Sequence, residues 1–393
     1  MADSSTVTVA PALLPPLLEV GYNYTWPFNK YGFSIGPRDL HHNPPNGADS
    51  ATPVFEDTVL VPPSGTLARN LAFLRDQLNI RKVRMFLLGN AFNYGRRPLG
   101  PLSGGTFVFT APPQPDPLFF QHFRAMLRIF KANGMQILPS LIDFGAFYPA
   151  GSGGGSGRTS ILTSQRKVFI ETMLKPMARV SQEPAVEGAV FAWEVVNEPM
   201  WNTVGLPVRP HTDSLGPDID PEIMGTFIQD CLDAFKAEGI NQTTVGHRLL
   251  QDLDRFPTGS LPQFHYYAAV GLLQRIGGVA DPSTIPTFAE LGKNPRTANA
   301  FVGEISATKE GTKFFDKGQG RRWPECNDRD TNVADAAFER LKVLARKGYK
   351  LAFVWPDRDD GTKENDRDDL KLTPTAVASV QRFTRGRFPN GVP

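Results

Sequence analysis

The sequence predicts an α/β protein in which eight strands and their helices form a single (β/α)8 barrel, a TIM barrel. Three observations favour this fold: strand-like and helix-like segments alternate, eight strands can be counted, and the long insertions follow strands. Alternating strands and helices imply a parallel sheet covered by helices. Because the insertions follow strands, they should lie on the C-terminal face of the barrel. We expect residues 1–16 to form an N-terminal tail and residues 17–393 to form the barrel domain.

The expected strands are short apolar segments. They lie near residues 17–23, 82–88, 135–142, 189–197, 246–252, 262–268, 300–304 and 350–355. The link between the fifth and sixth of them is too short for a full helix. The run from Gly151 to Gly157 follows the third strand and is expected to be a flexible loop tip. It lacks the Lys-Ser/Thr ending of a phosphate-binding loop, and no GxGxxG follows the first strand, so a nucleotide-binding sheet is not favoured.

The expected helices carry apolar residues at helical spacing and end at a glycine. One such face lies at 119–130 ahead of Gly134, another at 223–235 ahead of Gly239, and a third at 334–345 ahead of Gly348. Asp220 and Pro221 open the second helix with residues typical of the N-cap and the first helical position. Cys231 falls on the apolar face of this helix and is expected to pack there.

Composition argues against several classes of protein. Hydrophobic residues make up 40% and charged residues 21%, as in an ordinary globular domain. The net charge is only +2, and no cluster of Lys and Arg forms a basic stripe, so we expect no nucleic-acid partner. The two cysteines, Cys231 and Cys326, form no CxxC pair, which argues against a disulfide scaffold or a zinc knuckle.

No membrane or export segment is expected in this chain. No apolar run approaches the roughly 20 residues that span a bilayer. Residues 1–16 carry Asp3 where a signal peptide has positive charge, and prolines interrupt their apolar stretch. The sequence therefore allows either a cytoplasmic protein or a secreted one whose signal has been removed.

Two glutamates stand at the ends of expected strands. The segment from Trp193 to Pro199 is a strand that ends in Asn197-Glu198-Pro199, and Pro199 should both stop the strand and hold Glu198 in an extended backbone. The segment Phe301-Val-Gly-Glu304 is a second strand tipped by a carboxylate. One such glutamate alone could be a solvated loop residue, but two of them suggest a pair. Their separation, 304 minus 198, is 106 residues, which fits three βα units of about 35 residues each.

At this point the pattern resembles the clan A retaining glycosidases, which include the family 5 cellulases and mannanases. The likeness covers about residues 17–385 at the level of strand-end motifs. It implies that Glu198, at the end of strand four, is the acid/base and that Glu304, at the end of strand seven, is the nucleophile. It also implies that residues 17–393 are a catalytic domain.

Further positions match the same resemblance. His265-Tyr-Tyr267 ends strand six like the clan's His-x-Tyr, whose Tyr contacts the nucleophile. Arg84 resembles the clan's Arg that steadies the nucleophile, and Trp355 stands where the clan keeps a Trp under the sugar. One departure is Asp143 at the end of strand three, where family 5 usually has His. Asp143 is expected to fill that place or to bind a sugar hydroxyl.

The residue types suit retaining hydrolysis. One carboxylate attacks the anomeric carbon, while a second carboxyl protonates the leaving oxygen and later activates water. Arg84 and the Tyr267 hydroxyl would favour the ionised form of Glu304. Glu198 must start protonated, and a nearby charged Glu304 would help to keep it so. Asn197 is suited to hydrogen-bond the sugar 2-hydroxyl.

The remaining tryptophans divide into two groups. Trp26, Trp201 and Trp323 lie at or just after expected strand ends, where a flat ring can pack against a sugar, although core packing is the alternative for each. Trp193 lies within a strand and is expected to be a core residue.

Two other acidic features are expected to have no catalytic part. Glu194 shares the strand parity of Glu198 and is expected to be a buried partner of a barrel Arg. The loop that starts at Asp357 resembles a calcium loop weakly, and its interleaved basic residues favour a self-neutralised loop. We therefore expect no metal and no organic cofactor.

The sequence leaves three functions open: a retaining glycosidase, a transglycosylase with the same two glutamates, and a carbohydrate-binding barrel without activity. The presence of both carboxylates favours the first two. We expect a monomer that acts on an oligo- or polysaccharide, with the sugar, its linkage and endo or exo action undetermined.

Overall fold

The computed structural model describes residues 13–24, 66–88, 101–102, 106–107, 119–147, 159–203, 219–266, 285–306, 336–355, 370, 372 and 374–393. Within them, eight parallel strands close into a barrel in the order β10-β11-β2-β3-β6-β7-β8-β9. Their bounds are β2 (Glu19–Asn23), β3 (Lys82–Phe86), β6 (Gln136–Asp143), β7 (Trp193–Asn197), β8 (Thr243–His247), β9 (Gln263–Tyr266), β10 (Phe301–Ser306) and β11 (Leu351–Trp355). The predicted (β/α)8 barrel is confirmed.

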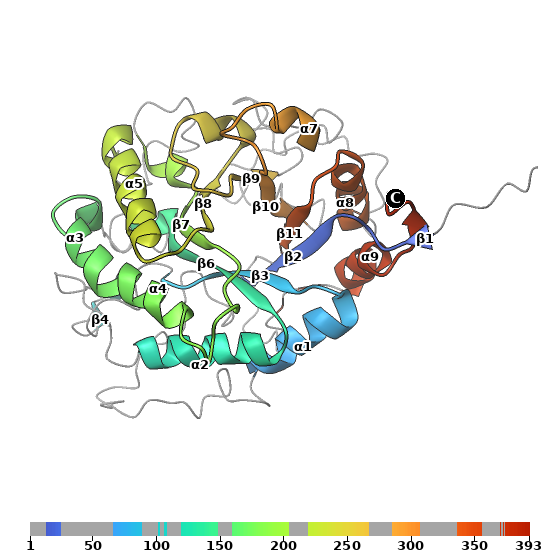
Figure 1. Ribbon diagram of the computed structural model, residues 1–393, viewed down its shortest axis with the longest axis horizontal. Coiled ribbons are helices and arrows are strands. Elements are labelled where there is room, and N and C mark those ends of the chain that lie inside the picture. The colour runs from blue at the N-terminus through green and yellow to red at the C-terminus, as the bar shows by residue number, and fades with distance from the viewer. Residues whose placement is uncertain are drawn as a thin grey trace, which may run out of the picture.

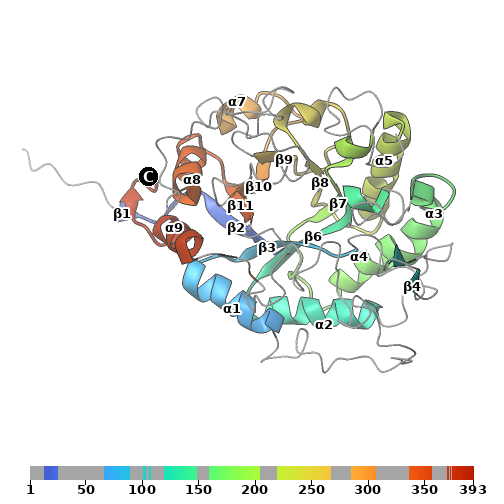
Figure 2. The same cartoon turned by 180° about the vertical axis from the view of Figure 1, so that it is seen from behind.

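Helices surround this inner ring of strands, as Figure 1 and the view from behind in Figure 2 show. They are α1 (Thr66–Leu78), α2 (Phe119–Ala132), α3 (Arg166–Phe169), the π-helical turn η5 (Ile170–Leu174), α4 (Lys175–Ser181), α5 (Pro221–Ala237), α7 (Phe288–Leu291), α8 (Ala336–Arg346) and α9 (Pro374–Thr384). Short 3-10 turns are η3 (Phe144–Phe147), η4 (Thr159–Leu162), η6 (Pro199–Asn202) and η7 (Leu250–Asp254). None of the helices in the described part is both long and apolar enough to cross a membrane.

Two short antiparallel pairs lie outside the barrel. β1 (Leu13–Leu14) pairs with β12 (Phe388–Pro389), and β4 (Pro101–Leu102) pairs with β5 (Thr106–Phe107). The last residues of the expected N-terminal tail thus form a strand beside the end of the chain (Figure 1).

The fifth barrel strand was misplaced by the sequence pattern. It was expected at 246–252, but β8 is Thr243–His247, and the apolar Leu249 and Leu250 lead into η7 instead. The pattern was misleading because β8 begins with two threonines, whose β-branched side chains suit a strand although they are polar. The short link to β9 does contain only a 3-10 turn within the described residues, as its length predicted.

The start and end of α5 follow the expected signals. Asp220 is its N-cap and accepts a hydrogen bond from the Glu222 backbone at 2.8 Å, and Pro221 follows it. Gly239, just past the end, has a φ of 81°, a left-handed conformation that glycine adopts without strain. Cys231 is buried on the inner face of α5, as predicted.

The layer between strands and helices is apolar. Trp193 on β7 is 1% exposed, and its ring centroid lies 6.0 Å from that of Phe123 on α2 and 5.1 Å from that of Phe235 on α5. Trp193 is therefore a core residue, as predicted. The parallel strands direct their carboxyl ends to one rim of the barrel, where the loops after the strands begin.

The barrel interior has no room for an added methyl group at Gly21 of β2. A Cβ there would lie 2.4 Å from the buried Phe353 ring of β11. We expect Gly21→Ala to lower the free energy of unfolding by about 1–3 kcal/mol, as overpacking does. Gly225→Ala is the matched control, because its Cβ would have no neighbour nearer than 4.0 Å within helix α5. Urea unfolding of both variants checks this, and equal stability of the two would contradict the tight packing.

Candidate active site

A buried arginine at the centre of the barrel mouth links three strands. Arg84 of β3 is 1% exposed and donates to both oxygens of Glu194 at 2.5 and 2.6 Å. It also donates to Glu304 Oε1 at 2.7 Å, to Asn197 Oδ1 at 2.7 Å and to Asn23 Oδ1 at 2.9 Å. Five hydrogen bonds therefore use the whole guanidinium group. The predicted role of Glu194 as a buried partner of a barrel arginine is confirmed.

This ion network keeps its members charged despite burial. Burial alone would lower the pKa of Arg84, but Glu194 and Glu304 more than offset it and raise that pKa. Burial alone would raise the pKa of Glu194, but Arg84 outweighs it and lowers that pKa. A charged guanidinium against Glu304 stabilises the carboxylate form that a nucleophile needs.

Sequence reasoning missed three residues that complete this network. Ser140 of β6 donates to Glu194 Oε1 at 2.8 Å, and Gln263 of β9 donates to Glu194 Oε2 at 3.1 Å. Asn23 of β2 donates to the Gly303 carbonyl at 3.0 Å. Ser140 is a polar residue inside an apolar strand, which is a signal, whereas Asn23 and Gln263 stand at strand ends, where polar residues are common. Gly303 leaves room for Gln263, because a Cβ there would lie 2.1 Å from Gln263 Nε2.

The backbone of Glu198 corrects one expectation. Pro199 was expected to hold Glu198 extended, but Glu198 has a φ of 47° and a ψ of 50°, in the left-handed region. Local contacts enforce this conformation: the Glu198 N–H donates to the Gly246 carbonyl at 2.7 Å, and the Glu198 carbonyl accepts from the Trp201 N–H at 3.1 Å. A non-glycine residue in this region is strained, and such strain is common at functional sites.

The turn at Glu198 aims its carboxyl group at two donors. The Trp201 indole donates to Oε2 at 2.6 Å, and His265 Nδ1 lies 2.7 Å from Oε1. The side chain is 12% exposed. Burial raises the pKa of Glu198 to about 7, against the lowering effects of Trp201, Arg248 and Arg84. A carboxyl group with this pKa is partly protonated near neutral pH and can act as an acid or as a base.

His265 lies between the two glutamates. Its Nδ1 is 3.4 Å from Glu304 Oε2 as well as 2.7 Å from Glu198 Oε1. Burial lowers the pKa of His265 to about 4, so the ring is neutral near neutral pH. Gln263 Nε2 lies 3.3 Å from His265 Nε2, and an amide nitrogen only donates, so the proton of the ring belongs on Nδ1, facing the carboxylates.

Asn197 and Asp143 form a second pair at the rim. They are neighbours in the register of β6 and β7, and Asn197 Nδ2 donates to Asp143 Oδ1 at 2.9 Å. Because Arg84 donates to Asn197 Oδ1, both ends of the amide are fixed. One Nδ2 proton is left for another acceptor, since an amide nitrogen carries two.

The other predicted site residues are only partly placed. Trp355 is the half-buried last residue of β11, in register with Ser306 of β10. Trp201 is half-buried and is tied to Glu198. Tyr267, Trp26 and Trp323 lie outside the described residues, as do the Gly151–Gly157 run and the loop at Asp357.

The two predicted glutamates come together across the barrel mouth. Oxygen atoms of Glu198 and Glu304 and a His265 nitrogen all lie within 4.8 Å of one another. Among the described residues this is the one set close enough to share a metal ion. Its atoms are already engaged, however, because His265 bridges the carboxylates and Arg84 holds Glu304. The contacts fit a proton-sharing network better than a metal centre.

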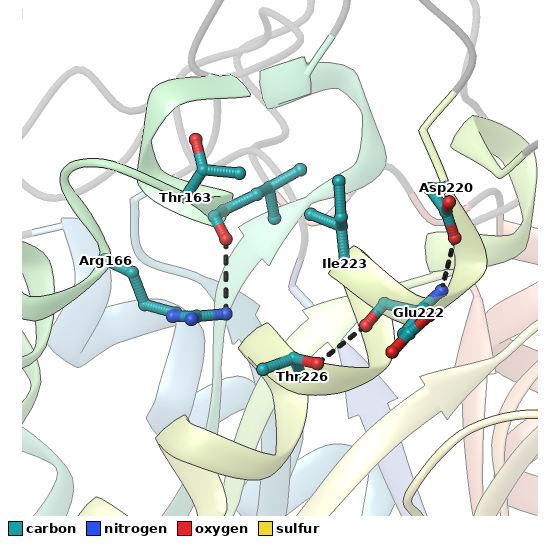
Figure 3. Close-up of a pocket in the computed structure, with 7 residues that line it drawn as sticks. Thr163, Arg166, Asp220, Glu222, Ile223 and Thr226 are labelled. Carbon is teal, nitrogen blue, oxygen red and sulfur yellow. Dashed lines mark hydrogen bonds between the residues drawn. The ribbon is translucent and has the colours of Figure 1, made fainter.

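A separate pocket lies between η4 and the start of α5, away from these residues (Figure 3). Arg166 on its wall donates to the Leu162 carbonyl and forms an ion pair with Asp230. Asp220 and Thr226 are occupied by helix hydrogen bonds. Its two acidic residues, Asp220 and Glu222, stand at the start of α5, where Asp220 is the N-cap of the helix.

The comparisons with known proteins point to one class of barrel. No protein-family model and no curated protein sequence matches the chain. Solved structures do match. A β-mannanase from the blue mussel Mytilus edulis is 15% identical, with a TM-score of 0.54 over 96% of this chain and 97% of that one. This chain shares the (β/α)8 barrel fold of that enzyme.

Two other structures extend the likeness. A β-1,4-mannanase from the sea hare Aplysia kurodai is 13% identical, with a TM-score of 0.55 over 96% of this chain and 95% of that one. A GH5_18 protein from Streptomyces cattleya, in complex with Manβ1-4GlcNAc, is 14% identical, with a TM-score of 0.55 over 94% of this chain and 80% of that one. The expected resemblance to the family 5 barrels is therefore confirmed for the fold.

Proposed function

We propose that this protein is a retaining glycoside hydrolase, with Glu304 as the nucleophile and Glu198 as the acid/base. The observation that carries the proposal is the approach of the two carboxyl groups, whose oxygens lie within 4.8 Å of each other. Retaining enzymes keep their carboxyl groups about 5–5.5 Å apart, whereas inverting enzymes need about 6.5–9.5 Å to admit a water molecule.

The first chemical step forms a glycosyl-enzyme. Glu304 attacks the anomeric carbon, the bond to the leaving oxygen breaks, and that oxygen takes the proton of Glu198. In the second step Glu198, now a carboxylate, removes a proton from water while the water oxygen displaces Glu304. Two displacements at one carbon restore its configuration.

The environments of the two glutamates differ as these roles require. Arg84 donates to Glu304 at 2.7 Å, which supports its ionised form. Glu198 has a pKa near 7 through burial, which supports its protonated form at mildly acidic pH. The free proton of Asn197 Nδ2 is available for the sugar 2-hydroxyl, while Trp355, Trp201, Trp26, Trp323, Asp143 and Tyr267 stay candidates for sugar contacts.

The pH dependence follows from the sign of the Glu198 shift. As an acid, Glu198 must be protonated in the first step, so kcat/KM should fall as pH rises through the pKa of about 7. Above that value the fall should reach about tenfold per pH unit. A pH series of kcat/KM with a constant-ionic-strength buffer measures this limb. A profile flat from pH 6 to 9 would contradict the acid role of Glu198.

β-Mannosidic linkages are the first substrates to test. The solved structures quoted above are named as mannanases or contain Manβ1-4GlcNAc. A panel of mannan, glucan, galactan and arabinose-containing polymers, with product sizing and NMR of the fresh anomeric centre, tests both substrate and mechanism. A product of inverted configuration would overturn the proposal.

The same experiment separates the alternative functions. A transglycosylase would give longer products when an acceptor sugar is added. A carbohydrate-binding barrel would bind a polymer but release no reducing ends.

A further inference from the structure

A short loop directly after β7 folds back onto Glu198. In η6, directly after β7, the Trp201 N–H donates to the Glu198 carbonyl at 3.1 Å, and its indole donates to Glu198 Oε2 at 2.6 Å. The backbone and the side chain of Trp201 thus hold the backbone and the side chain of Glu198. A hydrogen bond to a carboxylate stabilises the ionised form.

A buried ion pair holds the indole in turn. The guanidinium carbon of Arg248, just after β8, lies 4.7 Å from the centroid of the Trp201 ring. Arg248 is 4% exposed and pairs with Asp252 of η7, which is 1% exposed, at 3.2 Å. Phe144 contacts the same ring, at 6.4 Å between centroids. Trp201 therefore lies between residues from the loops after β6 and β8.

The guanidinium group of Arg248 is only partly paired. Its Nη1 is buried and has no hydrogen-bond partner among the residues that the structure describes, and Asp252 is shared with Arg255 at 3.5 Å. A buried cation that is only partly neutralised attracts nearby negative charge more strongly than a fully paired one. Trp201 connects Arg248 to Glu198, and the charge of Arg248 acts on the Glu198 carboxyl group to lower its pKa.

We propose that Trp201 and Arg248 are positioning residues for Glu198: the indole fixes its carboxyl group, and the arginine fixes the indole and favours the ionised carboxylate. The proposal rests on the proposed function only in naming Glu198 the acid/base. Asp252 belongs to the same unit because it holds Arg248.

The charges around Glu198 agree with this assignment. The titratable and charged groups that face it are Arg84 from β3, His265 from β9, Glu304 from β10, and Arg248 and Asp252 from the β8–η7 loop. Burial raises the pKa of Glu198, and the Trp201 hydrogen bond, then Arg248, then Arg84 lower it. Without the Trp201 hydrogen bond and Arg248, Glu198 would hold its proton to a higher pH. It would then be slower to ionise when the leaving group departs.

Nuclear magnetic resonance tests the contact without any substrate. The chain has five tryptophans, so indole labelling with ¹⁵N gives few signals, and Trp201→Phe identifies the one from Trp201. The Trp201 signal should titrate with a midpoint near 7, the pKa of Glu198, and Glu198→Gln should abolish that titration. A Trp201 signal that does not respond to Glu198 overturns the proposal.

Variants of Arg248 test whether this arginine favours the ionised form of Glu198. In Arg248→Gln the midpoint should rise by about one pH unit, and Arg248→Lys should restore part of it because the charge returns. Arg179→Gln, which removes an exposed arginine paired with Glu238, is the matched control and should leave the midpoint unchanged. An unshifted midpoint in folded Arg248→Gln would overturn the role of Arg248, and Arg248→Lys provides the test if the Gln variant does not fold.

Kinetics separate positioning from sugar contact. In Trp201→Phe the alkaline limb of kcat/KM should move up by about half to one pH unit, because the ionised carboxyl loses a donor. If Trp201 served only as a platform for sugar, KM would rise and the limb would stay in place, which would overturn the proposal. If the wild-type chain hydrolyses no substrate, the indole titration still decides the positioning role, so the two proposals fail separately.

Discussion

Glu304→Ala is expected to lose about four to six orders of magnitude in kcat, the scale of losing a catalytic nucleophile. Glu198→Ala should lose a comparable factor with substrates whose leaving group needs a proton. Added azide distinguishes the two roles. In Glu304→Ala azide can attack the sugar only once, which gives a glycosyl azide of inverted configuration. In Glu198→Ala azide attacks the glycosyl-enzyme, which gives retained configuration.

The readout is NMR of the glycosyl azide, with circular dichroism to show that each variant folds. A glycosyl azide of retained configuration from Glu304→Ala, or of inverted configuration from Glu198→Ala, would show that the two roles are the other way round. Near-normal hydrolysis by either variant without azide would remove that residue from the mechanism altogether.

Arg84→Met is expected to cause the largest loss of stability. The arginine is 1% exposed and contacts Glu194 and Glu304, so its removal leaves two buried carboxylates without their cation. Breaking one side of a buried pair costs about 3–5 kcal/mol. Arg179→Met removes an exposed arginine from its pair with Glu238 and should leave stability close to that of the wild type. Urea unfolding of both variants measures the difference.

The pH dependence of this loss has a defined sign. Arg84 lowers the pKa of Glu194 in the folded chain, so the pair stabilises the protein above the unfolded pKa of about 4.3 and loses its effect in acid. In Arg84→Met, burial without a cation would instead raise that pKa. The variant should therefore be furthest below the wild type at neutral pH, and the gap should narrow as pH falls below about 4.3 toward the lowered pKa of Glu194. Arg84→Met/Glu194→Gln should recover part of the loss at neutral pH, and no recovery would exclude Glu194 as its source.

The strand ends were predictable because both signals are local. An apolar run that stops at Asn197-Glu198-Pro199 marks a strand and its last residue, and the barrel topology then brings that residue opposite Glu304. The pairing of Arg84 with Glu194 was predictable for the same reason: a charged residue inside an apolar strand needs a buried partner.

The parts that the sequence did not predict depend on tertiary contacts. Glu198 is left-handed because Gly246 of the next strand accepts its N–H and Trp201 closes the following turn, and the first of these contacts depends on the barrel. Trp201 was expected to contact sugar or to pack in the core, and nothing near it in the sequence indicates a contact with Arg248, which is 248 minus 201, or 47, positions away. Gln263 required knowledge of the barrel register, which places it beside Gly303.

The left-handed backbone conformation of Glu198 implies a conflict between stability and activity at position 198. A glycine or an asparagine would occupy this backbone conformation at a lower cost, by about 1 kcal/mol. Selection for a longer-lived chain would therefore favour losing the carboxyl group, while selection for turnover would favour keeping it. A heat-stabilised library of this protein, screened for folding alone, should drift toward inactive chains at position 198, so such a screen must include an assay of turnover.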